Sequence, residues 1–240
     1  MRKTKRKIKL ILSIFVLVIA ISSYYLKDSY GKVEDNKKIA TSSNISLDNI
    51  PEYDGNLYVT INGNKPYFKD EDLVNDSYEN YSELDNLGRA GVAVSNIGKD
   101  LMPTEKRGSI GMVKPTGWHT VKYDFVDGKY LYNRCHLIGY QLTGENANEK
   151  NLITCTRSMN TKGMLPFENM VADYVKETNN HVLYRVTPIY KGDNLLASGV
   201  LMEAESVEDK GKGILFNVYV YNNEKGITIN YQNGDSKISD

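Results

Sequence analysis

Hydrophobic residues typical of β-strands are most frequent in the last third of the chain. Residues 181–190 and 195–204 are rich in β-branched and aromatic side chains and flank Lys191-Gly-Asp-Asn194, a turn-forming sequence. This arrangement predicts a β-hairpin, and residues 214–221 have the same strand-forming composition. The C-terminal third is therefore expected to form antiparallel β-structure.

A different hydrophobic period appears just before these strands. Apolar residues recur there at i, i+3, i+4, i+7 and i+8, which is the stripe of a helix packed on a sheet: Phe167, Met170, Val171, Tyr174 and Val175. Earlier in the chain, residues 57–61 resemble one arm of a hairpin, and residues 70–81 are expected to be an acidic loop. Gly and Pro recur between residues 88 and 117, as in strands joined by turns. The predicted fold class is α+β with a central antiparallel β-sheet.

The N-terminus has the pattern of an export segment. Six Lys and Arg residues lie within the first nine positions, and residues 10–21 are apolar except for Ser13. Residues 1–26 are therefore interpreted as a signal peptide or a membrane anchor; cleavage after Ser22 and retention in the membrane both remain open. Polar residues 27–49 are expected to be a flexible linker, and residues 50–240 one exported domain, either secreted or held on the outer face of the membrane.

Export changes the charge balance of the folded part. Six of the 30 basic residues precede residue 26, so 24 basic residues remain against 30 acidic ones. A protein that holds nucleic acid statically usually carries a basic footprint, and this balance argues against that class. An enzyme that turns nucleic acid over needs only a local positive cleft.

Candidate chemistry begins at Arg134 and His136, which lie two residues apart in a β-prone run. Alternation along a strand places both side chains on one face. Histidine is the natural general base near neutral pH, and a neighbouring arginine both binds phosphate and lowers the pKa of the histidine. The pair alone does not distinguish a catalytic histidine from a structural one.

Three downstream residues make the pattern more specific. Asn151 follows the histidine, Asn160 lies nine residues after Asn151, and Glu168 lies eight residues after Asn160. With Arg134 and His136, they resemble the DNA/RNA non-specific endonuclease family, whose ββα-metal core has an Asp-Arg-Gly-His motif followed by Asn, Asn and Glu. Residues 84–90, 102–105 and 114–118 further resemble the secreted and surface nucleases of Gram-positive bacteria.

The resemblance implies a role for each of these residues. His136 would deprotonate a water that attacks phosphorus in line, and Arg134 would neutralise charge on the phosphoryl oxygens. Asn160 would be the direct protein ligand of Mg²⁺, with Mn²⁺ as a substitute, because an amide oxygen is a hard donor. Glu168 would orient water around the metal, and Asn151 would steady the site through hydrogen bonds. DNA and RNA would be the substrates, the products would carry 5′ phosphates, and no obligate protein partner is indicated.

Two departures from the family pattern put parts of this assignment in question. Asn133 and Cys135 stand where the motif has Asp and Gly. Pro166 lies between Asn160 and Glu168, so either the helix is kinked there or it begins afresh with Pro166 in its first turn, leaving Glu168 farther from the metal.

The two cysteines, Cys135 and Cys155, both fall inside the candidate catalytic segment. In an exported domain a disulfide can persist, yet two free and half-buried thiols fit the sequence equally well.

Two other functions remain as alternatives. A catalytically inactive surface receptor for DNA uptake would bind DNA in the presence of a chelator and never shorten it. A β-rich adhesion domain would make the register of the five residues accidental.

Overall fold

The computed structural model describes residues 50–239. The predicted signal peptide or anchor (1–26) and the predicted linker (27–49) lie outside these residues. Among the helices of the described part, none combines the length and the apolar character needed to cross a membrane.

A six-stranded antiparallel sheet forms the frame of the domain, in the order β1-β8-β7-β6-β3-β2. Its long central strands are the apolar stretches of the C-terminal third, which explains their near-complete burial. The strands are β1 (Tyr58–Thr60), β2 (Tyr78–Tyr81), β3 (Ala93–Ile97), β6 (Val182–Ile189), β7 (Gly199–Ser206) and β8 (Leu215–Tyr221). The α+β class with a central antiparallel sheet is thus confirmed.

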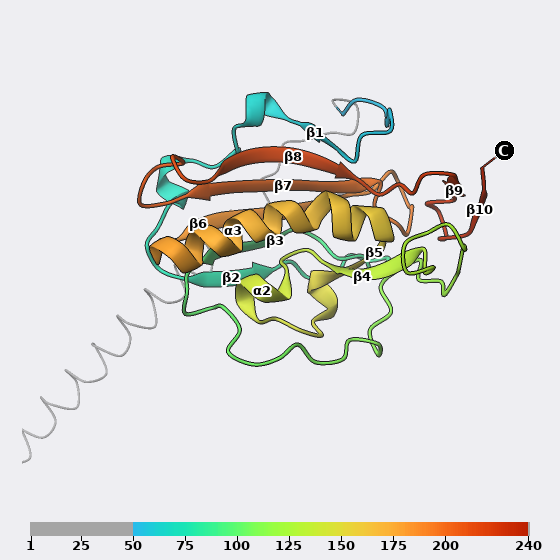
Figure 1. Ribbon diagram of the computed structural model, residues 1–240, viewed down its shortest axis with the longest axis horizontal. Coiled ribbons are helices and arrows are strands. Elements are labelled where there is room, and N and C mark those ends of the chain that lie inside the picture. The colour runs from blue at the N-terminus through green and yellow to red at the C-terminus, as the bar shows by residue number, and fades with distance from the viewer. Residues whose placement is uncertain (1–49, 240) are drawn as a thin grey trace, which may run out of the picture. The chain divides into compact units, whose positions relative to one another are not determined.

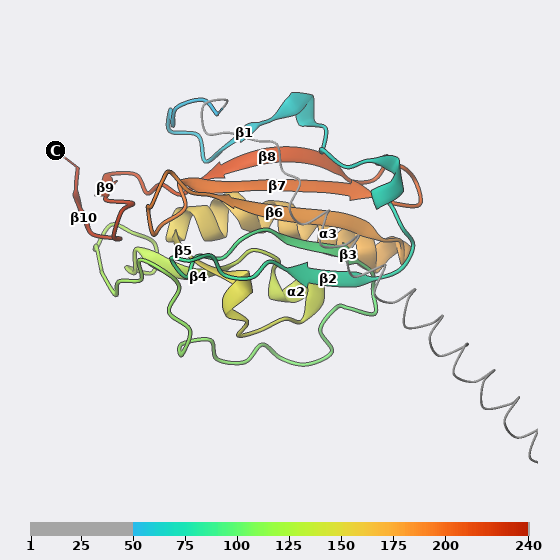
Figure 2. The ribbon, with the colours of Figure 1, turned by 180° about the vertical axis from the view of Figure 1, so that it is seen from behind.

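Helix α3 (Leu165–Thr178) lies across one face of this sheet, and the view from behind shows the sheet in front of the helix (Figures 1 and 2). Phe167, Val171 and Val175 pack into the main hydrophobic core, as their spacing predicted. Met170 is 46% exposed, however, and Ala172 is buried in its place. The buried stripe is therefore rotated from the predicted one, and this rotation also buries Glu168.

The opposite face of the sheet is covered by residues preceding β2. Apolar side chains of this layer, including Ile61, pack against Leu201 and Tyr219. In the same face Arg185 and Glu203 form a fully buried ion pair, with Nε and Oε2 2.7 Å apart. The strand near residues 57–61 was predicted as a hairpin arm, but β1 pairs with β8, far away in sequence. That part of the prediction is wrong because local spacing carries no information about so distant a partner.

A separate two-stranded sheet carries the candidate catalytic segment. Strand β4 (Tyr132–His136) pairs antiparallel with β5 (Leu152–Thr156), and the N-terminal end of α3 lies beside them (Figure 1). Cys135 and Cys155 form a disulfide with their Cα atoms 5.9 Å apart, within the range that a disulfide requires. The remaining elements are α2 (Tyr140–Thr143), β9 (Ile227–Ile229), β10 (Ser236–Ile238) and the short helices Asn62–Asn64, Asp70–Asp72, Glu149–Asn151 and Met159–Met164.

Three other sequence-based boundaries need correction. The stretch 70–81, expected to be loop, contains a 3₁₀ turn and the edge strand β2. Between residues 88 and 117 only β3 forms, and the rest is irregular. The β6–β7 hairpin closes at the pair Ile189 and Gly199, so its loop is wider than Lys191–Asn194, because Leu195 and Leu196 bond to the backbone of Gln232 and Tyr231 instead.

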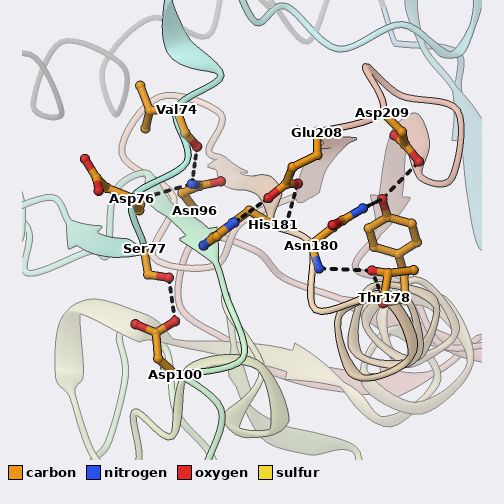
Figure 3. A network of polar contacts seen from close by, with 11 residues as sticks. Val74, Asp76, Ser77, Asn96, Asp100, Thr178, Asn180, His181, Glu208 and Asp209 are labelled. Carbon is orange, nitrogen blue, oxygen red and sulfur yellow. Dashed lines mark hydrogen bonds and ion pairs between the residues drawn. The ribbon is translucent and has the colours of Figure 1, made fainter.

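Polar side chains secure the outer layer to the end of the sheet (Figure 3). The Asn96 amide donates to the carbonyls of Val74 and Asp76, at 2.6 and 2.9 Å. His181 Nδ1 lies 2.6 Å from Glu208 Oε1, and the His181 backbone N–H donates to the same carboxylate. His181 therefore has a structural partner and lines neither of the cavities described below.

Candidate active site

His136 ends strand β4 and is only 6% exposed. Its Nε2 lies 2.7 Å from the Asn146 carbonyl oxygen, which can only accept, so Nε2 carries the proton. Nδ1 then carries the lone pair and accepts from Arg107 Nη2 at 3.3 Å. Burial lowers the pKa of His136 to about 4, helped by the Arg107 charge and opposed by the Asn146 hydrogen bond. The imidazole is therefore neutral at neutral pH, with its basic nitrogen directed at Arg107.

Arg107 comes from the irregular segment between β3 and β4. It lines both cavities of the site and contacts the histidine directly. In the sequence, 29 residues separate it from His136, so no local pattern links the two. Its proximity is created by tertiary folding.

Arg134 shares the cavity with His136 but contacts other groups. Its guanidinium donates to the carbonyls of Gly111 and Val113, the first at 2.9 Å, and its Cζ lies 3.9 Å from the centroid of the Trp118 ring. These contacts hold the 111–118 loop against β4. Arg134 thus fixes a wall of the site, and its edge contributes positive charge to the cavity.

Asn160 and Glu168 reach the same cavity of ≈ 290 Å³, together with Arg107, Arg134 and His136. Asn160 lies in a π-helical turn (Met159–Met164), and α3 begins immediately afterwards with Pro166 in its first turn. Met164 and Leu165 both have right-handed helical dihedrals, so the backbone stays helical from the π turn into α3 and the helix does not start afresh at Pro166. This continuous path keeps Glu168 on the cavity that Asn160 lines.

Glu168 is packed tightly against the start of α2. A Cβ on Gly139 would lie 2.8 Å from its Oε2, so glycine leaves the space that the carboxyl group occupies. Burial raises the pKa of Glu168 to about 8, while the Arg107 charge acts in the opposite direction. A nearby cation would therefore strongly stabilise the ionised form of this carboxyl group.

Asn151 is fully buried and lines neither cavity. Its Oδ1 accepts from the Ile138 N–H at 2.8 Å and its Nδ2 donates to the Ile138 carbonyl at 2.9 Å. Both bonds fix the backbone two residues after His136. Asn151 therefore contacts the segment that follows the histidine and does not line the site itself.

The donors around the cavity suit a hard cation. Asn160 offers an amide oxygen and Glu168 a carboxylate, which are the groups that Mg²⁺ prefers when water supplies most of its coordination. Within residues 50–239, no group of three or more His, Cys, Asp and Glu side chains is arranged to hold a metal.

A wider cavity of ≈ 570 Å³ adjoins this one and shares Arg107, Arg134 and Asn160 with it. Its walls are basic and aromatic, with Arg157, Trp118, His119 and Tyr130 among the lining residues. Such walls suit a polyanion that carries flat bases.

A ββα unit whose cavity gathers histidine, asparagine, glutamate and arginine defines the ββα-metal class of nucleases. The chain belongs to the DNA/RNA non-specific endonuclease family, whose sequence model matches residues 70–208. It is accordingly an enzyme that hydrolyses nucleic acids, and this membership favours the enzyme over the inactive receptor and the adhesion domain.

Solved nuclease structures resemble the chain over most of its length. NucA from Streptococcus agalactiae with magnesium bound is 26% identical, with a TM-score of 0.66, over 75% of this chain and 86% of that one. Its metal-free form is 25% identical, with a TM-score of 0.68, over 86% and 96% of the two chains. Sda1 nuclease with a bound zinc ion is 28% identical, with a TM-score of 0.64, over 77% and 97%.

Proposed function

We propose that the protein is a Mg²⁺-dependent, sugar-non-specific endonuclease that cleaves DNA and RNA to products with 5′ phosphates. The observation that carries the proposal is the convergence of the unprotonated Nδ1 of His136 with Asn160 and Glu168 on one cavity. In this proposal His136 is the general base, Asn160 the metal ligand and Glu168 the group that orients water. Asn151 supports the site through the backbone of Ile138.

In this mechanism the histidine transfers a proton and the arginines neutralise negative charge. His136 removes a proton from the attacking water through Nδ1, while the Asn146 carbonyl keeps Nε2 protonated and stabilises the imidazolium that forms. Arg107 and Arg134 offset the negative charge that develops on the phosphoryl oxygens. Arg107 is the better placed of the two, since Arg134 already donates to two backbone carbonyls.

Asn160 would hold the metal, and Glu168, which lines the same cavity, would orient water around it. When bound, Mg²⁺ supplies positive charge that stabilises the transition state and the leaving 3′ oxygen, so no side-chain general acid is needed. Mn²⁺ has similar ligand preferences and is expected to substitute. NucA was solved with magnesium and Sda1 with zinc, so the choice of metal in this chain requires its own measurement.

The proposal extends to location. An export segment at residues 1–26, followed by a linker at 27–49, would present a nuclease domain of residues 50–240 outside the cell, secreted or anchored.

The proposal is tested by cleavage of circular plasmid and of RNA, with and without a chelator, in the wild type and in His136→Ala. Chelation should abolish both cleavages, and His136→Ala should lower the rate by about 10²–10⁴-fold. His181→Ala is the matched control, because His181 pairs with Glu208 away from the cavity. Retained cleavage in His136→Ala would refute the role of the base, and DNA binding without cleavage would revive the receptor.

A further inference from the structure

Asn160 is the last of four side chains joined by hydrogen bonds along the wall of the wider cavity. Asn160 Nδ2 donates to Asn133 Oδ1 over 3.1 Å, and Arg157 Nη1 donates to the same oxygen over 3.4 Å. Arg157 is held in turn by Asp127, whose Oδ2 accepts from its Nε over 3.1 Å. All four residues line the wider cavity, and Asn160 also lines the catalytic one.

These hydrogen bonds determine which way each amide group faces. A guanidinium group can only donate, so Asn133 must turn its oxygen, and not its nitrogen, toward Arg157. That same oxygen faces Asn160, which must therefore offer its own nitrogen. Without Arg157 the two amides could both rotate by half a turn and still share one hydrogen bond. The guanidinium removes this second arrangement.

We propose that Asp127, Arg157 and Asn133 are positioning residues that fix the Asn160 carboxamide so that its oxygen is offered to the divalent cation. This inference rests on the proposed role of Asn160 as the metal ligand. It accounts for Asn133 at the motif position where the family has Asp. The chain of hydrogen bonds needs an acceptor oxygen at this position, and both side chains provide one.

The first test measures Mn²⁺ affinity directly by electron paramagnetic resonance on the full-length chain, alongside nuclease rates. Asn133→Leu removes the acceptor and should weaken Mn²⁺ binding by about 10–100-fold, the usual effect of losing a group that orients a ligand. Asn133→Asp keeps the acceptor and should bind Mn²⁺ like the wild type. Asn180→Leu, the same change at a partly buried asparagine that contacts Tyr174, is the matched control.

The second test separates amide orientation from a general structural role of Arg157. Arg157→Met keeps the aliphatic stem and removes the donors, so it should weaken Mn²⁺ binding when residue 133 is asparagine. A carboxylate at position 133 has two equivalent acceptor oxygens and cannot be turned the wrong way. The same Arg157→Met change in the Asn133→Asp background should therefore cost much less affinity.

The outcomes are distinct. Equal losses from Arg157→Met in both backgrounds, or wild-type Mn²⁺ affinity in Asn133→Leu, would overturn the positioning role. An Asn160→Ala protein that binds Mn²⁺ as the wild type does would instead refute the proposed metal ligand, and with it this inference. Thermal unfolding of each variant identifies any protein that fails to fold; should Asn133→Leu be among them, the two Arg157→Met backgrounds still decide the question.

Discussion

At the scale of the residue, the site is governed by where protons and lone pairs are held. His136 is buried between the carbonyl of Asn146 and the guanidinium of Arg107, and these two neighbours select one tautomer. The sequence predicted an arginine beside the histidine and named Arg134 for that place. In the structure Arg107 contacts the ring, while Arg134 holds the 111–118 loop. Residue type was therefore predictable, but the identity of the partner depended on a contact between distant segments.

The protonation state of His136 leads to a prediction about pH. Burial and the Arg107 charge lower the pKa of His136 to about 4 from 6.5, so the ring stays neutral and able to accept a proton at lower pH than usual. With metal kept saturating, kcat/KM on a short DNA should fall on the acid side only well below pH 6.5. Arg107→Gln should move this acid limb upward, because it removes a charge that disfavours the imidazolium.

A pH series of kcat/KM for the two proteins provides the measurement, and circular dichroism at each pH shows whether the fold persists. An acid limb at pH 6.5 in the wild type would contradict the prediction. So would an unchanged limb in Arg107→Gln.

At the scale of the element, prediction succeeded where a local pattern determines the structure. The strand containing Arg134 and His136 and the helix near residues 167–175 both formed as expected. The exposed side of α3 was misjudged at Met170, because hydrophobic spacing gives a period and leaves the rotation of the helix to its packing partner. The π-helical turn before α3 had no sequence signal, yet it leads the chain from Asn160 into the helix that carries Glu168.

The start of α2 and the first turn of α3 meet at Gly139 and Glu168. Gly139 has φ −58°, which alanine adopts without strain, but a Cβ there would lie 2.8 Å from the Glu168 carboxylate. Gly139→Ala should therefore displace Glu168 and lower kcat/KM by about 10–100-fold, while the free energy of unfolding changes by less than about 1 kcal/mol.

Cleavage kinetics and urea unfolding measure the two quantities separately. Gly111→Ala is the matched control, since a Cβ at Gly111 finds only Ser109 Oγ at 3.8 Å. Wild-type kinetics in Gly139→Ala would show that the position of Glu168 does not matter. A large loss of stability would show that the glycine serves packing instead.

At the scale of the whole molecule, the fold depends on contacts that sequence patterns do not reveal. The pairing of β1 with β8 and the layer before β2 that covers the sheet join segments far apart in the chain. The buried Arg185 and Glu203 pair also lies in this face, although charged residues are seldom expected in a core. The strand-forming stretches were predictable from composition, whereas their order in the sheet was not. The residues that line the catalytic cavity were likewise not fully predictable, because Arg107 contacts His136 only in the folded protein.

The disulfide joins strands β4 and β5, which carry the candidate catalytic segment, and so connects them to the stability of the domain. Cys135 and Cys155 are 20 residues apart, and the loop that they close contains His136, Asn146 and Asn151. Closing a loop of this length stabilises the folded state by about 3 kcal/mol, so reduction should lower Tm by about 6–12 °C. Because β4 and β5 stay paired through their backbone, cleavage activity below the new Tm should persist.

Thermal unfolding with and without dithiothreitol measures the shift in the wild type. The double variant Cys135→Ala, Cys155→Ala should unfold at the lower temperature in both conditions, since the chain has only these two cysteines. Thiol titration shows whether reduction of the wild type is complete. If it is complete and the Tm is unchanged, the pairing of β4 with β5 needs no covalent support.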